Sequence, residues 1–139
     1  MAKVRDIMQK HVITIDSDKT ALDAAKLMEE KDISFLVIHQ DEKPIGVVTE
    51  RDFVRKISAA DKNASKIPLT DMMSPKYRSV SPENDIEDAV QKMLNHNIRR
   101  LIVTENDSVV GVITQTDLTG YLRSKILING TLEKIESES

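Results

Sequence analysis

The sequence of 139 residues contains no cysteine and no tryptophan, and aromatic residues make up only 3% of it. Without cysteine, the chain forms neither disulfide bonds nor thiolate metal sites, which fits a reducing compartment. With so few aromatic side chains, a planar ligand would have to stack mainly on aliphatic groups. Because the chain lacks cysteine, we expect a cytoplasmic protein.

Long apolar runs and a strong net charge are also absent. No run approaches the roughly 18 apolar residues that a membrane span needs. The net charge is −3, with 40% hydrophobic and 31% charged residues, as in soluble globular proteins. Because the chain has no basic excess, we expect neither nucleic acid nor an anionic membrane as a partner.

Signatures of catalysis and of metal binding are missing as well. The three histidines do not cluster in the sequence, and no H-x-x-x-H spacing occurs, so no metal site is expected. Neither a G-x-S-x-G elbow nor a glycine-rich phosphate loop is present. We therefore do not expect an enzyme.

What the chain does contain is one unit repeated twice. Residues 4–57 and 69–122 align without a gap at an offset of 65. The segment GVVTERD, from Gly46 to Asp52, falls on GVITQTD, from Gly111 to Asp117. A unit of this size buries a poor core alone, so we expect the two copies to pack on each other with pseudo-two-fold symmetry.

Each copy is predicted to be a β-α-β-β-α unit, so that the chain has a mixed α/β (α+β) fold. Capping-box patterns that begin at Thr20 and Asp85 mark the first helix of each copy. The predicted strands are 12–15, 35–38, 45–48, 78–80, 101–103 and 109–113, and the predicted helices are 20–31, 50–57, 85–96 and 115–127. The expected domains are a first repeat at 4–57, a linker at 58–68, a second repeat at 69–127 and a polar tail at 128–139.

The motifs Thr49-x-x-Asp52 and Thr114-x-x-Asp117 lie where an apolar strand becomes a helix. One interpretation is a capping box, in which threonine caps the helix and aspartate returns the hydrogen bond. The other is a ligand site, because a helix N-terminus suits phosphate and an ionised aspartate can accept from two ribose hydroxyls. The two interpretations are compatible, and recurrence at one offset favours more than capping.

Arg99 and Arg100 precede the strand that starts at Leu101. They fit a solvated surface pair, but guanidinium groups beside an apolar strand also suit phosphate. The equivalent residues in the first copy are Ser34 and Phe35, so the two copies differ in charge. We therefore expect the phosphates of an anionic ligand to lie toward this arginine pair, at the start of the helix after Thr114.

Taken together, these motifs resemble tandem CBS domains, the regulatory repeats named after cystathionine β-synthase. The resemblance covers residues 4–57 and 69–122. It rests on the segments that open the two repeats, VRDIM and LTDMM, and on the helices that contain Asp-Ala-x-x-x-Met. It also rests on the two Gly-h-h-Thr-x-x-Asp segments, in which h is an apolar residue. It implies a pseudo-two-fold pair with clefts between the sheets, no catalysis and an adenosine-containing ligand. AMP, ADP or ATP is expected before S-adenosylmethionine or NAD.

The resemblance also implies which residues hold the ligand. Asp52 and Asp117 would bind ribose hydroxyls, with Thr49 and Thr114 near phosphate and Thr116 inside the second motif. The adenine pocket and its opposite wall would comprise Thr14, Ile15, Ile33, Ser34, Phe35 and Leu36 in the first copy, and Ser79, Val80, Ile98, Arg99, Arg100 and Leu101 in the second.

The leading functional hypothesis is a regulatory module that senses an adenine nucleotide and signals to a separate effector protein. The alternative is a ligand-free interaction module that docks on a partner enzyme or transporter, with the motifs serving only as helix caps. Short helices are expected to leave apolar surface at the rim of the sheets, which predicts a homodimer with closed two-fold symmetry.

Overall fold

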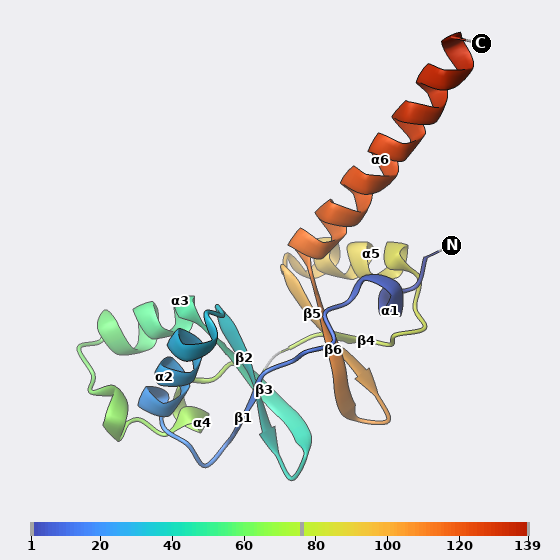
Figure 1. Ribbon diagram of the computed structural model, residues 1–139. Coiled ribbons are helices and arrows are strands. Elements are labelled where there is room, and N and C mark those ends of the chain that lie inside the picture. The colour runs from blue at the N-terminus through green and yellow to red at the C-terminus, as the bar shows by residue number, and fades with distance from the viewer. Residues whose placement is uncertain (1, 76, 139) are drawn as a thin grey trace.

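The computed structural model describes residues 2–75 and 77–138, with side chains as far as residue 128. Two lobes lie side by side, and each contains a three-stranded sheet covered by helices (Figure 1). The first lobe contains β1 (Thr14–Asp16), α2 (Ala21–Lys31), β2 (Phe35–Gln40), β3 (Lys43–Thr49), α3 (Glu50–Phe53), a π-helix (Val54–Ser58), a 3₁₀ helix (Ala64–Lys66) and α4 (Leu69–Met72). The second lobe contains α1 (Val4–Ile7), β4 (Ser79–Val80), α5 (Ile86–His96), β5 (Arg100–Glu105), β6 (Ser108–Thr114) and α6 (Gln115–Glu138).

The two sheets have the same topology. In the first lobe β2 is central, parallel to β1 and antiparallel to β3. In the second lobe β5 is central, parallel to β4 and antiparallel to β6. The antiparallel pairs shift register at equivalent places, after Ile38 and after Val103. The predicted mixed fold with two β-α-β-β-α repeats is therefore confirmed.

Local side-chain chemistry fixes where the repeat helices begin and end. The Thr20 hydroxyl accepts from the amide of Asp23 at 3.2 Å, and the amide of Thr20 donates to the Asp23 carboxylate at 3.0 Å. The amide and the hydroxyl of Thr20 both donate to the Asp23 carboxylate and thereby lower the pKa of Asp23. The helices end at Lys31 and His96, as the sequence predicts, and the cap residues that follow, Asp32 and Asn97, both have a positive φ.

The opening helices are exchanged between the two repeats. Val4 of α1 is fully buried in the core of the second lobe, whereas Leu69 of α4 is fully buried in the core of the first lobe. Figure 1 shows α1 beside β6 and α4 beneath α2. Each lobe therefore takes part of its core from the other repeat, which ties the two together.

Two segments are more ordered than their composition indicates. One is the chain that joins the two repeats, and the other is the C-terminal segment. Ala64 and Ile67, inside the expected linker, pack against the first core. The last helix continues to Glu138 and projects from the second lobe, so its predicted end near residue 127 is wrong (Figure 1). Residues 127–138 contain no proline and several good helix formers, and this propensity outweighs their polarity.

Candidate functional site

A cleft of about 590 Å³ lies between the two lobes. The first lobe contributes the start of β2 and the junction between β3 and α3. The second lobe contributes the end of α5, the start of β5 and the residues that precede β4. The lining used below comprises Ser34, Phe35, Thr49, Glu50 and Arg51 from the first repeat, and Tyr77, Arg78, His96, Ile98, Arg99 and Arg100 from the second.

The charge of this cleft is strongly positive. Arg51, Arg78, Arg99 and Arg100 face a single acidic side chain, that of Glu50. Among the described residues, none of these arginines forms a salt bridge. Arg51, Arg78 and Arg99 are exposed to solvent, whereas Arg100 is partly buried. A partly buried positive charge without an acidic partner is stabilised when an anion binds. The cleft is therefore suited to an anionic ligand.

Arg100 joins the two walls of the cleft. Its guanidinium lies 4.9 Å from the centroid of the Phe35 ring and donates a hydrogen bond of 3.1 Å to the Ser34 hydroxyl. Burial and the nearby charge of Arg99 lower the pKa of Arg100, and Glu50 acts in the opposite direction. Because an arginine stays protonated in a protein, this environment favours a negatively charged partner at Arg100.

Both Thr-x-x-Asp motifs form capping boxes, as the first interpretation predicts. The amide of Thr49 donates to Asp52 Oδ2 at 2.8 Å, and the amide of Asp52 donates to Thr49 Oγ1 at 3.4 Å. The equivalent hydrogen bonds between Thr114 and Asp117 measure 2.9 and 3.2 Å. Each box uses Oδ2 of its aspartate, which leaves Oδ1 outside the box.

The cleft brings together only part of the predicted site. The predicted residues in its lining are Ser34, Phe35, Thr49, Ile98, Arg99 and Arg100. The predicted residues outside its lining are Thr14, Ile15, Ile33, Leu36, Asp52, Ser79, Val80, Leu101, Thr114, Thr116 and Asp117. Four of these, Ile15, Leu36, Val80 and Leu101, are buried in the lobe cores.

The side chain of Arg100 faces the first repeat, although its backbone lies beside Thr114. The two residues are partners in the β5–β6 ladder, and the amide of Gln115 donates to the carbonyl of Arg99. The Arg100 guanidinium nevertheless reaches across to Ser34. The Arg100 guanidinium therefore lies on the side of the first repeat and not at the start of α6.

Sequence reasoning missed Tyr77, Arg78 and Arg51. The signal was present, because the equivalents of Arg78 and Arg51 in the other copy are the uncharged Ile13 and Thr116. The same kind of charge difference between copies had drawn attention to the arginine pair before β5. A position-by-position comparison of charge would have found these two arginines, whereas Tyr77 becomes evident only from the packing of the lobes.

The comparisons with known proteins show the family of this chain. The family description CBS domain matches residues 4–59 and again residues 69–124. Because these matches cover most of the sequence, the chain belongs to the CBS-domain family. It is a pair of CBS domains, and such pairs are commonly ligand-binding regulatory modules rather than enzymes.

Three relatives define the similarity more closely. CBS domain-containing protein YhcV of Bacillus subtilis is 30% identical over 118 residues, which cover 85% of this chain and 84% of that protein. Protein MK0525 of Methanopyrus kandleri is 33% identical over 117 residues, which cover 83% of this chain but only 60% of that protein. The CBS domain pair of protein MJ0100, solved in complex with 5′-methylthioadenosine and S-adenosyl-L-methionine, is 25% identical. Its TM-score is 0.80, with 90% of this chain and 98% of that chain covered.

Two further types of site are not found. Within residues 2–75 and 77–128, no cluster of three or more histidine or acidic side chains could hold a metal ion. No helix in this part of the chain combines the length and the apolar character that crossing a membrane requires.

Proposed function

We propose that this CBS pair is a regulatory module that binds AMP, ADP or ATP in the cleft between its lobes. The observation that carries the proposal is the set of four arginines that line the cleft without a salt bridge among the described residues. The phosphate groups of a nucleotide would neutralise these positive side chains and would accept charge-assisted hydrogen bonds from them.

Phosphates bound at the arginines would determine where the ribose and the base lie. The phosphates would lie between the arginine pair at the start of β5 and Thr49, which precedes α3. The ribose hydroxyls would bind Asp52, which follows the lining residue Arg51 and keeps Oδ1 outside its capping box. The Tyr77 ring would offer a stacking surface for the base.

The charge of the cleft also selects among adenosine-containing ligands. S-adenosylmethionine carries a sulfonium and an ammonium group, and both would be repelled by the arginines. The ligands of the MJ0100 pair carry no phosphate. We therefore propose a phosphorylated ligand here, with S-adenosylmethionine as the weaker alternative.

Binding would be transmitted through the contact between lobes. Phosphate would compete with the Ser34 hydroxyl for Arg100, and this hydrogen bond joins the two repeats. Replacing this hydrogen bond with one to phosphate would change the relative stability of different arrangements of the two lobes. A separate effector protein would recognise that change.

Calorimetric titration tests the proposal. AMP, ADP and ATP should bind to the purified protein more tightly than S-adenosylmethionine does. The absence of heat with all four compounds would contradict the proposal.

The second candidate, a ligand-free module that docks on a partner enzyme or transporter, is favoured by the capping boxes at Thr20, Thr49 and Thr114, in which both hydrogen bonds form. Thermal unfolding separates the two candidates. A nucleotide at 100 times its Kd should stabilise the protein by about 2.7 kcal/mol, which a ligand-free module would not show.

We also propose that the protein is a homodimer. Exposed apolar side chains follow one another on α6, where it projects from the second lobe (Figure 1): Leu122, Ile126, Leu127 and Ile128 are 51–67% exposed. Apolar surface gathered on one element usually marks an interface. Light scattering at micromolar concentration should give the mass of a dimer, and Ile126→Asp should shift it toward that of a monomer. A monomeric wild-type protein would contradict this prediction.

A further inference from the structure

A second groove lies on the first lobe, between α2 and α3, and shares only Glu50 with the arginine cleft. Its cavity has a volume of about 220 Å³. Apolar and acidic side chains line it without any basic side chain: Met28, Ile33 and Phe53 are apolar, and Glu29, Asp32 and Glu50 are acidic. Among the described residues, none of these three carboxylates forms a salt bridge. The groove therefore suits an occupant that is both apolar and basic.

The negative charge of this groove is specific to the first lobe. The three acidic positions of the first repeat are uncharged in the second repeat, where their equivalents are Leu94, Asn97 and Gln115. Leu94 is exposed on α5, so the second lobe presents apolar surface where the first lobe presents a carboxylate. The helical surfaces of the two lobes thus differ in charge.

The helix α6 carries the groups that the groove suits. Leu122 and Ile126 are both exposed, and they share one face of the helix because they lie four residues apart. Lys125 lies next to this face, three residues after Leu122. Between residues 118 and 128, α6 contains two basic residues and no acidic residue. Figure 1 shows α6 projecting away from the first lobe, so it does not reach the groove of its own chain.

We infer that α6 of one copy docks in the α2–α3 groove of a second copy, so that the first lobe of each copy faces the second lobe of the other. This inference rests on the proposed homodimer and gives its orientation. A two-fold axis makes the two contacts equal, since each copy offers one helix and one groove. The opposite orientation would place carboxylates against carboxylates and basic side chains against basic side chains, which disfavours it.

Cross-linking through introduced cysteines tests the orientation. The natural chain contains no cysteine, so each variant has a single thiol and every cross-link joins two copies. Glu29→Cys marks the groove, and Lys125→Cys marks α6. When the two variants are co-expressed, a short bismaleimide should join one to the other. Neither variant should cross-link when it is expressed alone.

Lys43→Cys, co-expressed with Lys125→Cys, is the matched control. Lys43 follows the turn between β2 and β3, at the end of the first lobe that lies away from α3 (Figure 1). This pair should give no cross-link. All three replaced side chains are exposed, so each variant should keep the oligomeric state and the unfolding temperature of the wild type.

Salt dependence gives a second measurement of the charge complementarity. Higher ionic strength screens the attraction between the groove and α6, so the Kd of the wild-type dimer should rise several-fold in sedimentation experiments. Glu29→Lys should raise this Kd at low ionic strength. A dimer that becomes tighter as salt is added would contradict the inference, because it would indicate that like charges meet.

The inference and the proposed homodimer fail separately. If the wild type is a dimer but Glu29→Cys or Lys125→Cys cross-links with itself, or the co-expressed pair does not cross-link, the orientation is wrong and the homodimer stands. A monomeric wild type would overturn both.

Discussion

Arg100→Ala should bind AMP, ADP and ATP about ten-fold more weakly, or worse, and should bind adenosine as the wild type does. The variant loses charge-assisted hydrogen bonds to phosphate, and such bonds contribute about 1.5–3 kcal/mol. A loss of about 1.4 kcal/mol is already ten-fold in Kd. Adenosine carries no phosphate, so its affinity should change little. Parallel calorimetric titrations of the variant with adenosine and with ATP measure this difference.

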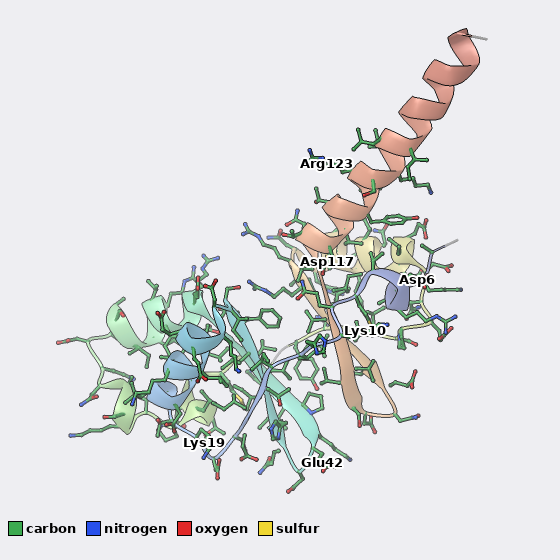
Figure 2. All side chains as sticks on the ribbon, in the orientation of Figure 1. Asp6, Lys10, Lys19, Glu42, Asp117 and Arg123 are labelled. Atoms are coloured by element: carbon green, nitrogen blue, oxygen red, sulfur yellow. The ribbon has the colours of Figure 1, made fainter. Side chains whose placement is uncertain are left out.

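Arg123→Ala is the matched control. Arg123 is exposed on α6, away from the cleft (Figure 2), and its removal changes the net charge by the same amount. It should leave both affinities unchanged. Unaltered ATP binding by Arg100→Ala, or an equal loss of adenosine and ATP, would contradict the assignment of phosphate to Arg100.

Alanine at Gly46 or Gly111 should destabilise the protein by about 1–3 kcal/mol, because each glycine makes room for a segment of the other repeat. A Cβ atom at Gly46 would lie 2.8 Å from the Met73 sulfur and 2.8 Å from the Ser74 carbonyl oxygen. At Gly111 the corresponding distances are 2.6 Å to Met8 and 2.9 Å to the Gln9 carbonyl. Those carbonyls belong to the backbone bridges that hold the exchanged segments, so they cannot move without weakening the bridges.

Gly120 provides the control for this pair. It lies within α6, and a Cβ atom there would have no heavy atom within 4 Å. Gly120→Ala should raise stability by roughly 0.5–1 kcal/mol through helix propensity. Denaturant unfolding of the three variants tests the comparison. Equal stability of Gly46→Ala and Gly120→Ala would show that the exchanged segments do not pack as described.

The sequence predicts the repeat units well because local patterns determine them. Apolar alternation, capping boxes and turn residues all act within a few positions, so the helices and strands were placed to within a few residues, except for the end of α6. The exchange of α1 and α4 could not be predicted in this way. The apolar character of Val4 and Leu69 indicates burial, but it does not say in which lobe, since that depends on the path of the chain between them.

The candidate site shows the same limit. Arg99 and Arg100 stood out because the other copy has no charge there, and both line the cleft. Their backbone lies beside Thr114, as their position in the chain implies. The direction of the Arg100 side chain depends on how the two lobes face each other. It therefore became clear only from the contact with Phe35.

A crystal structure of the protein with bound ATP tests the central claim most directly. The phosphates are predicted to contact Arg99 and Arg100 and to lie near Thr49, with the ribose at Asp52. The Arg100 guanidinium should then have left the Ser34 hydroxyl for a phosphate oxygen. Phosphates bound at Thr114 instead, or an arginine cleft that stays empty at saturating ATP, would contradict the account.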